Sequence, residues 1–288
     1  MSKKSSSKTN FLAQGTILVI ASFVAKAIGM IYRIPLTHIL GDDGNGYYST
    51  ANEIYTIILM ISSFSLPLAV SRLVAEREYA GEVKNSYKVL ICSLRFAAVT
   101  GGILSILTFL LGGVITKYVM GVELASYALR VLAPAIFLFA LTGVLRGFFQ
   151  GHGTMVPTAV SQIIEQIFVA TFALLMSHVF IQHFSATGDM DLVHRWGAAG
   201  ATMGTGAGVA SALIFMLIVY GVNRKIIRKR IANDHHSVNE SMGHVMSNIV
   251  LIIMPIILSA FIYNVNGYIN SYMYSGIMDI KGAAKDVI

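Results

Sequence analysis

Long apolar runs set the architecture of this 288-residue chain. A helix needs about 20 apolar residues to cross the roughly 30 Å hydrocarbon core of a bilayer. The sequence holds seven such runs, at about residues 11–40, 47–74, 87–115, 124–145, 155–181, 196–222 and 245–277. The composition agrees, because 55% of the residues are hydrophobic and only 12% are charged. These runs predict an all-α, multi-pass membrane helix bundle and exclude an ordinary soluble domain.

The basic residues outside these runs alternate from loop to loop. One set of loops holds Lys3, Lys4, Lys8, Arg72, Arg77, Lys84, Lys88, Arg146 and the cations of 224–230. The other set holds Lys117 and Arg195 together with Asp42, Asp43, Asp189 and Asp191. The positive-inside rule therefore predicts a cytoplasmic N-terminus. The run 223–230 could also contact anionic lipid headgroups or nucleic acid, but topology is its default interpretation.

Two cations lie inside the first apolar run. Lys26 and Arg33 are seven residues apart, about two helical turns, so they share one face of a helix, with Gly29 between them leaving room for close approach. A charge at bilayer depth costs roughly 2.5 to 3.5 kcal/mol, so it persists where it faces water, an acid or a ligand. The pair predicts one wall of an anion-accepting cavity. The alternative is that one or both side chains snorkel to a headgroup region.

Further polar residues lie within the apolar runs. Arg130 precedes Pro134, at an expected kink of the fourth run, and Glu53 lies early in the second run. Glu165 and Gln166 fall near the middle of the fifth run, where a carboxyl group is protonated, paired with a cation or hydrated. Since cations predominate among the charged groups at depth, the interior favours an anionic amphiphile over a cationic drug.

Two glycine-containing segments could be either structural elements or ligand-binding sites. Gly200, Gly204 and Gly208 follow a four-residue spacing that predicts a flat face for another helix; a nucleotide-binding loop would need a preceding strand and a following Lys-Ser/Thr. Asp42 and Asp43 lie in the segment GDDGNG at 41–46, which could hold a metal ion but is more typical of a tight turn between helices. We therefore predict no catalytic residues and no metal site.

Three segments resemble one family of membrane proteins. They are LRGFFQGHGTMVPTAVSQIIEQ at 145–166, LGDDGNGYY at 40–48 and SLPLAVSRLVAE at 65–76. In sequence and order they resemble the stage V sporulation protein B branch of bacterial polysaccharide exporters. This branch belongs to the multidrug, oligosaccharidyl-lipid and polysaccharide exporter superfamily, which also contains the lipid II flippases.

The resemblance implies a domain organisation. Residues 1–10 would be a basic cytoplasmic tail, 11–222 the N-terminal six-helix lobe, 223–243 a basic cytoplasmic linker and 244–288 the start of a second lobe with helix seven. Members of the family have two such lobes, arranged as a V around a central cationic cavity. The resemblance therefore also implies that this chain is a fragment that lacks most of the second lobe.

The resemblance also implies a function and roles for residues. The expected function is a flippase of the bacterial plasma membrane that moves an undecaprenyl-diphosphate-linked saccharide, either lipid II for peptidoglycan or a polysaccharide repeat unit, by alternating access. Lys26, Arg33 and Arg130 would bind the lipid diphosphate, and Glu53, Glu165 and Gln166 would serve gating and charge pairing. The basic residue that the family pattern carries shortly after Glu165–Gln166 is absent here. The expected partners are the lipid-linked saccharide and the bilayer, not nucleic acid, with no cofactor and with coupling to the membrane potential or to a Na⁺ or H⁺ gradient.

Three other functions remain open from the residues alone. A drug or cation antiporter of the same superfamily would need a mainly acidic cavity. A metal-dependent membrane enzyme acting on lipid-linked sugars would use Asp42 and Asp43. A non-transporting scaffold in cell-wall or spore-coat assembly would tolerate every substitution in the cavity.

Overall fold

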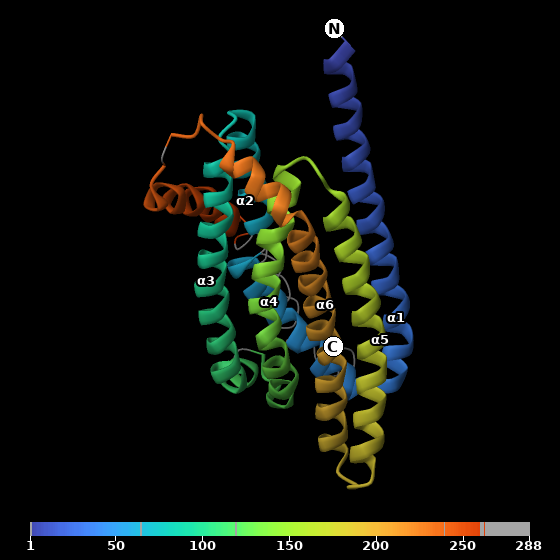
Figure 1. Ribbon diagram of the computed structural model, residues 1–288. Coiled ribbons are helices and arrows are strands. Elements are labelled where there is room, and N and C mark those ends of the chain that lie inside the picture. The colour runs from blue at the N-terminus through green and yellow to red at the C-terminus, as the bar shows by residue number, and fades with distance from the viewer. Residues whose placement is uncertain (1, 64, 119, 239, 260–261, 263–288) are drawn as a thin grey trace.

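All secondary-structure elements among the described residues are helices. The computed structural model describes residues 2–63, 65–118, 120–238, 240–259 and 262, with side chains from residue 14 onward (Figure 1). Its elements are α1 (Ser2–Ser62), α2 (Leu66–Tyr79), α3 (Val83–Tyr118), the 3-10 turn η1 (Glu123–Ala125), α4 (Ser126–Gly151), α5 (Val156–Ser185) and α6 (Met190–Ala232). A last helix, Met242–Ser259, is called here the crossing helix. Among the described residues, six helices are long and apolar enough to cross a membrane.

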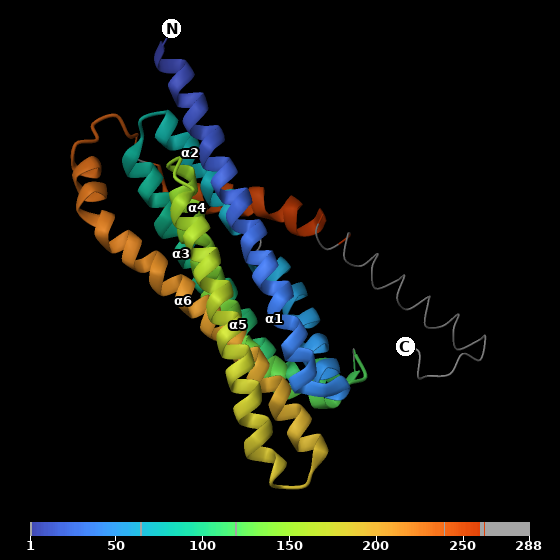
Figure 2. The same ribbon diagram turned by 90° about the vertical axis from the view of Figure 1, so that its right-hand side faces the viewer.

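Helix α1 contains the first predicted span and most of the second, joined by a sharp turn. Its 61 residues would extend about 90 Å if straight, three times the thickness of the hydrocarbon core. At Gly41 the backbone takes φ 67° and ψ −177°, a conformation that suits glycine, and the chain reverses there. The two halves of α1 consequently form a hairpin, and the second half runs from the turn obliquely behind the other helices toward α2 (Figures 1 and 2).

Helix α4 lies at the centre of the bundle, in contact with α1, α2, α3 and α6. Two apolar cores surround it. The upper core, toward the N-terminus in Figure 1, includes Leu66, Val70, Leu90, Leu145 and Phe148. The lower core, near the α1 turn, includes Leu36, Leu40, Leu129, Leu132 and Ile136. These two clusters hold the helices that carry the polar side chains described below.

The predicted glycine face on α6 is confirmed as a helix-packing surface. A Cβ atom at Gly200 would lie 2.6 Å from the carbonyl oxygen of Met176, and one at Gly204 would lie 2.5 Å from the amide nitrogen of Ala173. Both neighbours are backbone atoms of α5, so α5 and α6 are in close contact along this face.

Replacing Gly204 by valine is expected to separate these helices and to lower the free energy of unfolding by about 1 to 3 kcal/mol, because the added atoms overlap backbone that has little freedom to move. Gly206→Val is the matched control, since a Cβ there would meet no atom within 4 Å. Both variants can be compared by the temperature at which the single cysteine, Cys92, becomes reactive, because its side chain is only 1% exposed in the fold. Equal midpoints for the two variants would contradict the packing argument.

The ends of three helices depart from what the apolar runs and the predicted tail and linker suggest. The chain is already helical from Ser2, within the expected tail of residues 1–10. The predicted span 47–74 is interrupted, because α1 ends at Ser62 and Pro67, at the start of α2, lacks the N–H that a continuous helix requires. Helix α6 continues to Ala232, so residues 223–232 of the predicted linker 223–243 are helical.

The crossing helix also differs from the predicted seventh span, 245–277. It begins at Met242, and the structure describes it as far as Ser259. In Figures 1 and 2 it runs across the other helices rather than alongside them. Val245, Ile249 and Ile253 of this helix are at most 2% exposed and pack into the upper core. The apolar run is therefore helical in its described part, but this helix lies across the upper part of the bundle. Residues 263–277 of the predicted span lie outside the described residues.

A polar network fastens the linker to the corner between α2 and α3. Arg77 donates two hydrogen bonds to Glu240, of 2.7 and 3.0 Å. The backbone N–H of Lys84 donates to the Asp234 carboxylate at 2.7 Å, and Ser237 donates to the same side chain. These hydrogen bonds, first that from Ser237 and then that from Lys84, hold the pKa of Asp234 well below its usual range. At neutral pH the ionised Asp234 therefore helps to hold the linker at this corner, beside the ion pair of Arg77 and Glu240.

Candidate functional site

Lys26 and Arg33 line one hollow on the exposed side of α1. Its volume is about 480 Å³, and its lining residues are Phe23, Ala25, Lys26, Gly29, Met30, Tyr32, Arg33 and Gln166. Both cations are exposed, and no carboxylate of the described residues lies within 4.0 Å of either nitrogen group. A Cβ at Gly29 would lie 3.5 Å from Oε1 of Gln166, so this glycine lets α5 bring its amide close to α1. We call this space the cationic hollow.

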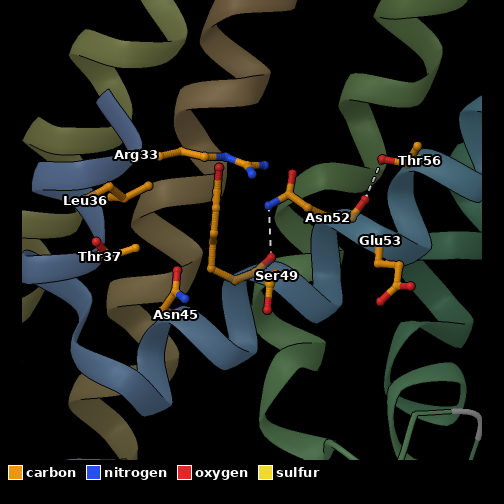
Figure 3. Close-up of a pocket in the computed structure, with 9 residues that line it drawn as sticks. Arg33, Leu36, Thr37, Asn45, Ser49, Asn52, Glu53 and Thr56 are labelled. Atoms are coloured by element: carbon orange, nitrogen blue, oxygen red, sulfur yellow. Dashed lines mark hydrogen bonds between the residues drawn. The ribbon is translucent and has the colours of Figure 1, made fainter. Parts of the chain in front are cut away.

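Arg33 also lines a second, more polar hollow inside the α1 hairpin. This polar hollow has a volume of about 360 Å³ and is lined by Arg33, Leu36, Thr37, Asn45, Tyr48, Ser49, Asn52, Glu53 and Thr56. In Figure 3 the Arg33 side chain reaches from the first half of α1 toward the second half, whereas the Glu53 carboxylate points away from it. Because Arg33 belongs to both spaces, the two hollows adjoin.

The side chains of the polar hollow mainly offer hydrogen-bond acceptors. Thr37 donates its hydroxyl hydrogen to the carbonyl of Ile34, Ser49 to that of Gly46 and Thr56 to that of Asn52, at 2.8 to 3.0 Å. Once a hydroxyl has donated its hydrogen to its own helix, its oxygen can only accept from a ligand. With the Glu53 carboxylate added, this hollow suits a ligand rich in hydroxyl groups.

Arg130 lies away from both hollows. Its side chain packs against α3, where its Cγ would be 3.4 Å from a Cβ at Gly112 and its Nη2 would be 3.3 Å from a Cβ at Gly113. The structure thus brings Lys26, Arg33, Gln166 and Glu53 around two adjoining spaces, and places Arg130 elsewhere.

Glu165 is held in an ion pair on the inner side of α5. One of its carboxylate oxygens lies 2.7 Å from Nη2 of Arg146, and the two side chains are only 12% and 8% exposed. Nε of Arg146 also donates to the hydroxyl of Ser161 at 2.9 Å. Sequence reasoning assigned Arg146 to a cytoplasmic loop and so missed this partner. The available signal was the segment 145–166 itself, since a turn between antiparallel α4 and α5 brings its two ends together.

Asp42 and Asp43 do not form a metal-binding cluster. Across the part of the chain that the structure describes, no group of three or more His, Cys, Asp or Glu side chains is placed to hold a metal ion. Asp43 instead lies 3.6 Å from Nδ1 of His194, at the start of α6. The two aspartates therefore lie at the turn of the α1 hairpin, as the glycines around them indicate.

Comparison with known proteins places this geometry in a family. Residues 11–281 match the model of the family described as polysaccharide biosynthesis protein. Stage V sporulation protein B of Bacillus subtilis is 26% identical over 278 residues, which cover 96% of this chain and 51% of that protein. The lipid II flippase MurJ of Bacillus subtilis is 27% identical over 213 residues, covering 71% of this chain and 39% of that protein. The chain thus spans about half or less of the length of these relatives.

Solved structures share the fold. A transporter of the multidrug, oligosaccharidyl-lipid and polysaccharide superfamily from Pyrococcus furiosus superposes with a TM-score of 0.62 at 17% identity, over 88% of this chain and 52% of that one. The family match and the similarity to stage V sporulation protein B confirm the resemblance of the three sequence segments. The solved structure shares the predicted all-α bundle.

Proposed function

The chain belongs to the family of polysaccharide biosynthesis proteins, and on that premise we propose that it forms one lobe of a flippase for isoprenoid-diphosphate-linked saccharides. Such a lipid carries a diphosphate, a sugar headgroup and a long apolar tail. The lobe offers a matching surface for each part. The observation that carries the proposal is that Lys26 and Arg33, two exposed cations with no carboxylate partner among the described residues, share one hollow on a membrane helix.

The diphosphate would lie in the cationic hollow. Hydrogen bonds between an ionised donor and a phosphate oxygen are stronger than those between neutral groups, and they favour the diphosphate over an uncharged lipid. Arg33 would contact both the diphosphate and the first sugar, because it also lines the polar hollow. The acceptor side chains of that hollow would receive hydrogen bonds from sugar hydroxyl groups. Gln166, at the rim on α5, would add an uncharged contact.

The proposal also covers the orientation of the protein, the second wall of the cavity and the energy source of transport. The N-terminus would lie in the cytoplasm, in keeping with the basic loops, and the saccharide would move to the outer leaflet of a bacterial plasma membrane. A second lobe would supply the opposite wall of the cavity. The membrane potential or a sodium or proton gradient would drive the cycle, with Glu53 as a charged group at the cavity wall.

A binding experiment on this chain tests the proposal directly. The protein is placed in phosphatidylcholine nanodiscs, and its affinity is measured for undecaprenyl diphosphate, undecaprenyl monophosphate and undecaprenol. We expect the diphosphate to bind at least tenfold more tightly than the alcohol, with the monophosphate between them.

Other outcomes would assign another function. Equal affinity for diphosphate and alcohol would remove the reason to propose phosphate recognition. Tighter binding of a cationic dye such as ethidium would indicate a drug antiporter. Turnover of the diphosphate that depends on a divalent metal and is lost in Asp42→Asn would indicate an enzyme.

A further inference from the structure

The C-terminal end of α6 carries a surface that the flippase proposal does not use. Helix α6 has 43 residues, or about 65 Å at the usual rise, which is twice the thickness of the hydrocarbon core. Its upper half diverges from α5, as Figure 2 shows. Its last turns carry Arg224, Lys225, Arg228 and Lys229, all of them exposed. We call these four residues the basic face.

The basic face continues an apolar stripe on the same side of α6. With 100° of rotation per residue, Arg224, Lys225, Arg228 and Lys229 fall within an arc of about 140°. Ile214, Leu217 and Ile218, two to three turns earlier, fall within the same arc, and they are 59%, 51% and 59% exposed. One side of the helix thus changes from exposed apolar residues to cations along its length.

The position of the basic face is fixed by a fifth cation. Nη2 of Arg230, on the opposite side of the helix, lies 2.5 Å from Oε2 of Glu78 in α2. The other oxygen of Glu78 lies 3.2 Å from Nε2 of His152, after α4. This anchor holds the end of α6 against the bundle and turns the basic face outward. Among the described residues, no carboxylate lies within 4.0 Å of any of the four cations of that face.

We propose that the basic face binds the phosphates of anionic phospholipids in the leaflet at this end of the bundle. A helix side that meets acyl chains along Ile214, Leu217 and Ile218 meets headgroups about two to three turns further on, where the cations begin. Each Lys or Arg near an anionic membrane surface contributes about fivefold to binding. A soluble polyanion would gain nothing from the adjoining apolar stripe, whereas a phospholipid contacts both parts.

The test compares lipid retention by matched variants. The chain is reconstituted in nanodiscs that contain phosphatidylglycerol and phosphatidylcholine with identical acyl chains, and the lipids that remain bound are counted by native mass spectrometry. We expect the wild type to retain phosphatidylglycerol in preference. We expect Arg224→Gln, Lys225→Gln, Arg228→Gln and Lys229→Gln together to reduce that preference at least tenfold.

Two control variants separate the basic face from other cations. Arg224→Lys with Arg228→Lys keeps the charge and should keep the preference. Lys117→Gln with Arg195→Gln removes two cations from the opposite end of the bundle and should leave the preference unchanged. Burial of Cys92 in every variant, measured by its slow labelling, establishes that the fold is intact.

Two results would overturn the proposal. One is an unchanged preference in the fourfold glutamine variant, which would place the retained lipid at Lys26 and Arg33 or elsewhere. The other is binding of a short oligonucleotide to the wild type in phosphatidylcholine nanodiscs, lost in the fourfold variant, with no preference between the two lipids. That result would assign the face to nucleic acid.

Discussion

Replacing Glu165 by alanine is expected to destabilise the lobe by about 3 to 5 kcal/mol. The substitution leaves the Arg146 guanidinium, 8% exposed, without its carboxylate partner inside the bundle. Desolvation of the unpaired charge then opposes folding, and the hydrogen bond from Arg146 to Ser161 compensates only in part. The effect appears as a lower temperature at which Cys92 becomes reactive, and as a matching shift in the fluorescence of Trp196, the single tryptophan of the chain.

An exposed ion pair provides the matched control for this prediction. Lys117 and Glu123 lie 3.0 Å apart, but their side chains are 50% and 65% exposed. Removal of this pair by Glu123→Ala should change the stability by about 1 kcal/mol or less. Replacing both partners of the buried pair, as Arg146→Met with Glu165→Leu, should recover much of the stability lost in the single variant. If Glu165→Ala is no more disruptive than Glu123→Ala, the pair does not hold α4 and α5 together.

Replacing Lys26 and Arg33 by glutamine is expected to reduce the affinity for undecaprenyl diphosphate by about 100-fold or more. A hydrogen bond to a charged group contributes about 1.5 to 3 kcal/mol, and the double variant removes two charged donors from the cationic hollow. Both side chains are exposed in the fold, so the unfolding temperature should stay near that of the wild type. The measurement is equilibrium binding in phosphatidylcholine nanodiscs, together with growth of flippase-depleted cells that depend on a protein containing this chain. Growth should fail while membrane levels persist.

The variant Arg130→Gln tests whether a loss of affinity comes from the cationic hollow itself or from any loss of positive charge in the membrane helices. Arg130 is also a cation in a membrane helix, but it packs against Gly112 and Gly113 of α3, away from both hollows. Its replacement should leave diphosphate affinity within about twofold of the wild type. A loss as large as that of the Lys26 and Arg33 variant would indicate a diffuse electrostatic effect, and growth on Lys26→Gln with Arg33→Gln would remove these residues from the transport path.

The parts of the fold predictable from sequence were those determined by local periodicity. The apolar runs located the helices, the four-residue glycine spacing located the contact between α5 and α6, and the seven-residue spacing placed Lys26 and Arg33 on one side of α1. Each depends on residues a few turns apart in one helix, where geometry follows directly from the rise and twist.

The parts that could not be predicted depend on which helices meet. Arg146 lies near the end of an apolar run, so charge counting assigns it to a loop; only contact between α4 and α5 reveals that it pairs with Glu165. The linker likewise looks like a flexible polar connection, yet Arg77, Lys84 and Asn85 bind it from a distant part of the sequence. The direction of the crossing helix depends on the same tertiary contacts, because its apolar pattern suits a membrane span equally well.

The turn at Gly41 has a further consequence for selectivity. Both walls of the polar hollow belong to a single hairpin, so a rigid-body rotation of the lobe moves Arg33, Asn52 and Glu53 together and leaves their separations unchanged. Under the proposed function, a headgroup held there would meet the same atoms of this hairpin whichever side of the membrane the site faces. The hairpin would then contribute equally to discrimination between sugars during loading and during release, and any difference between the two steps would arise from groups outside it.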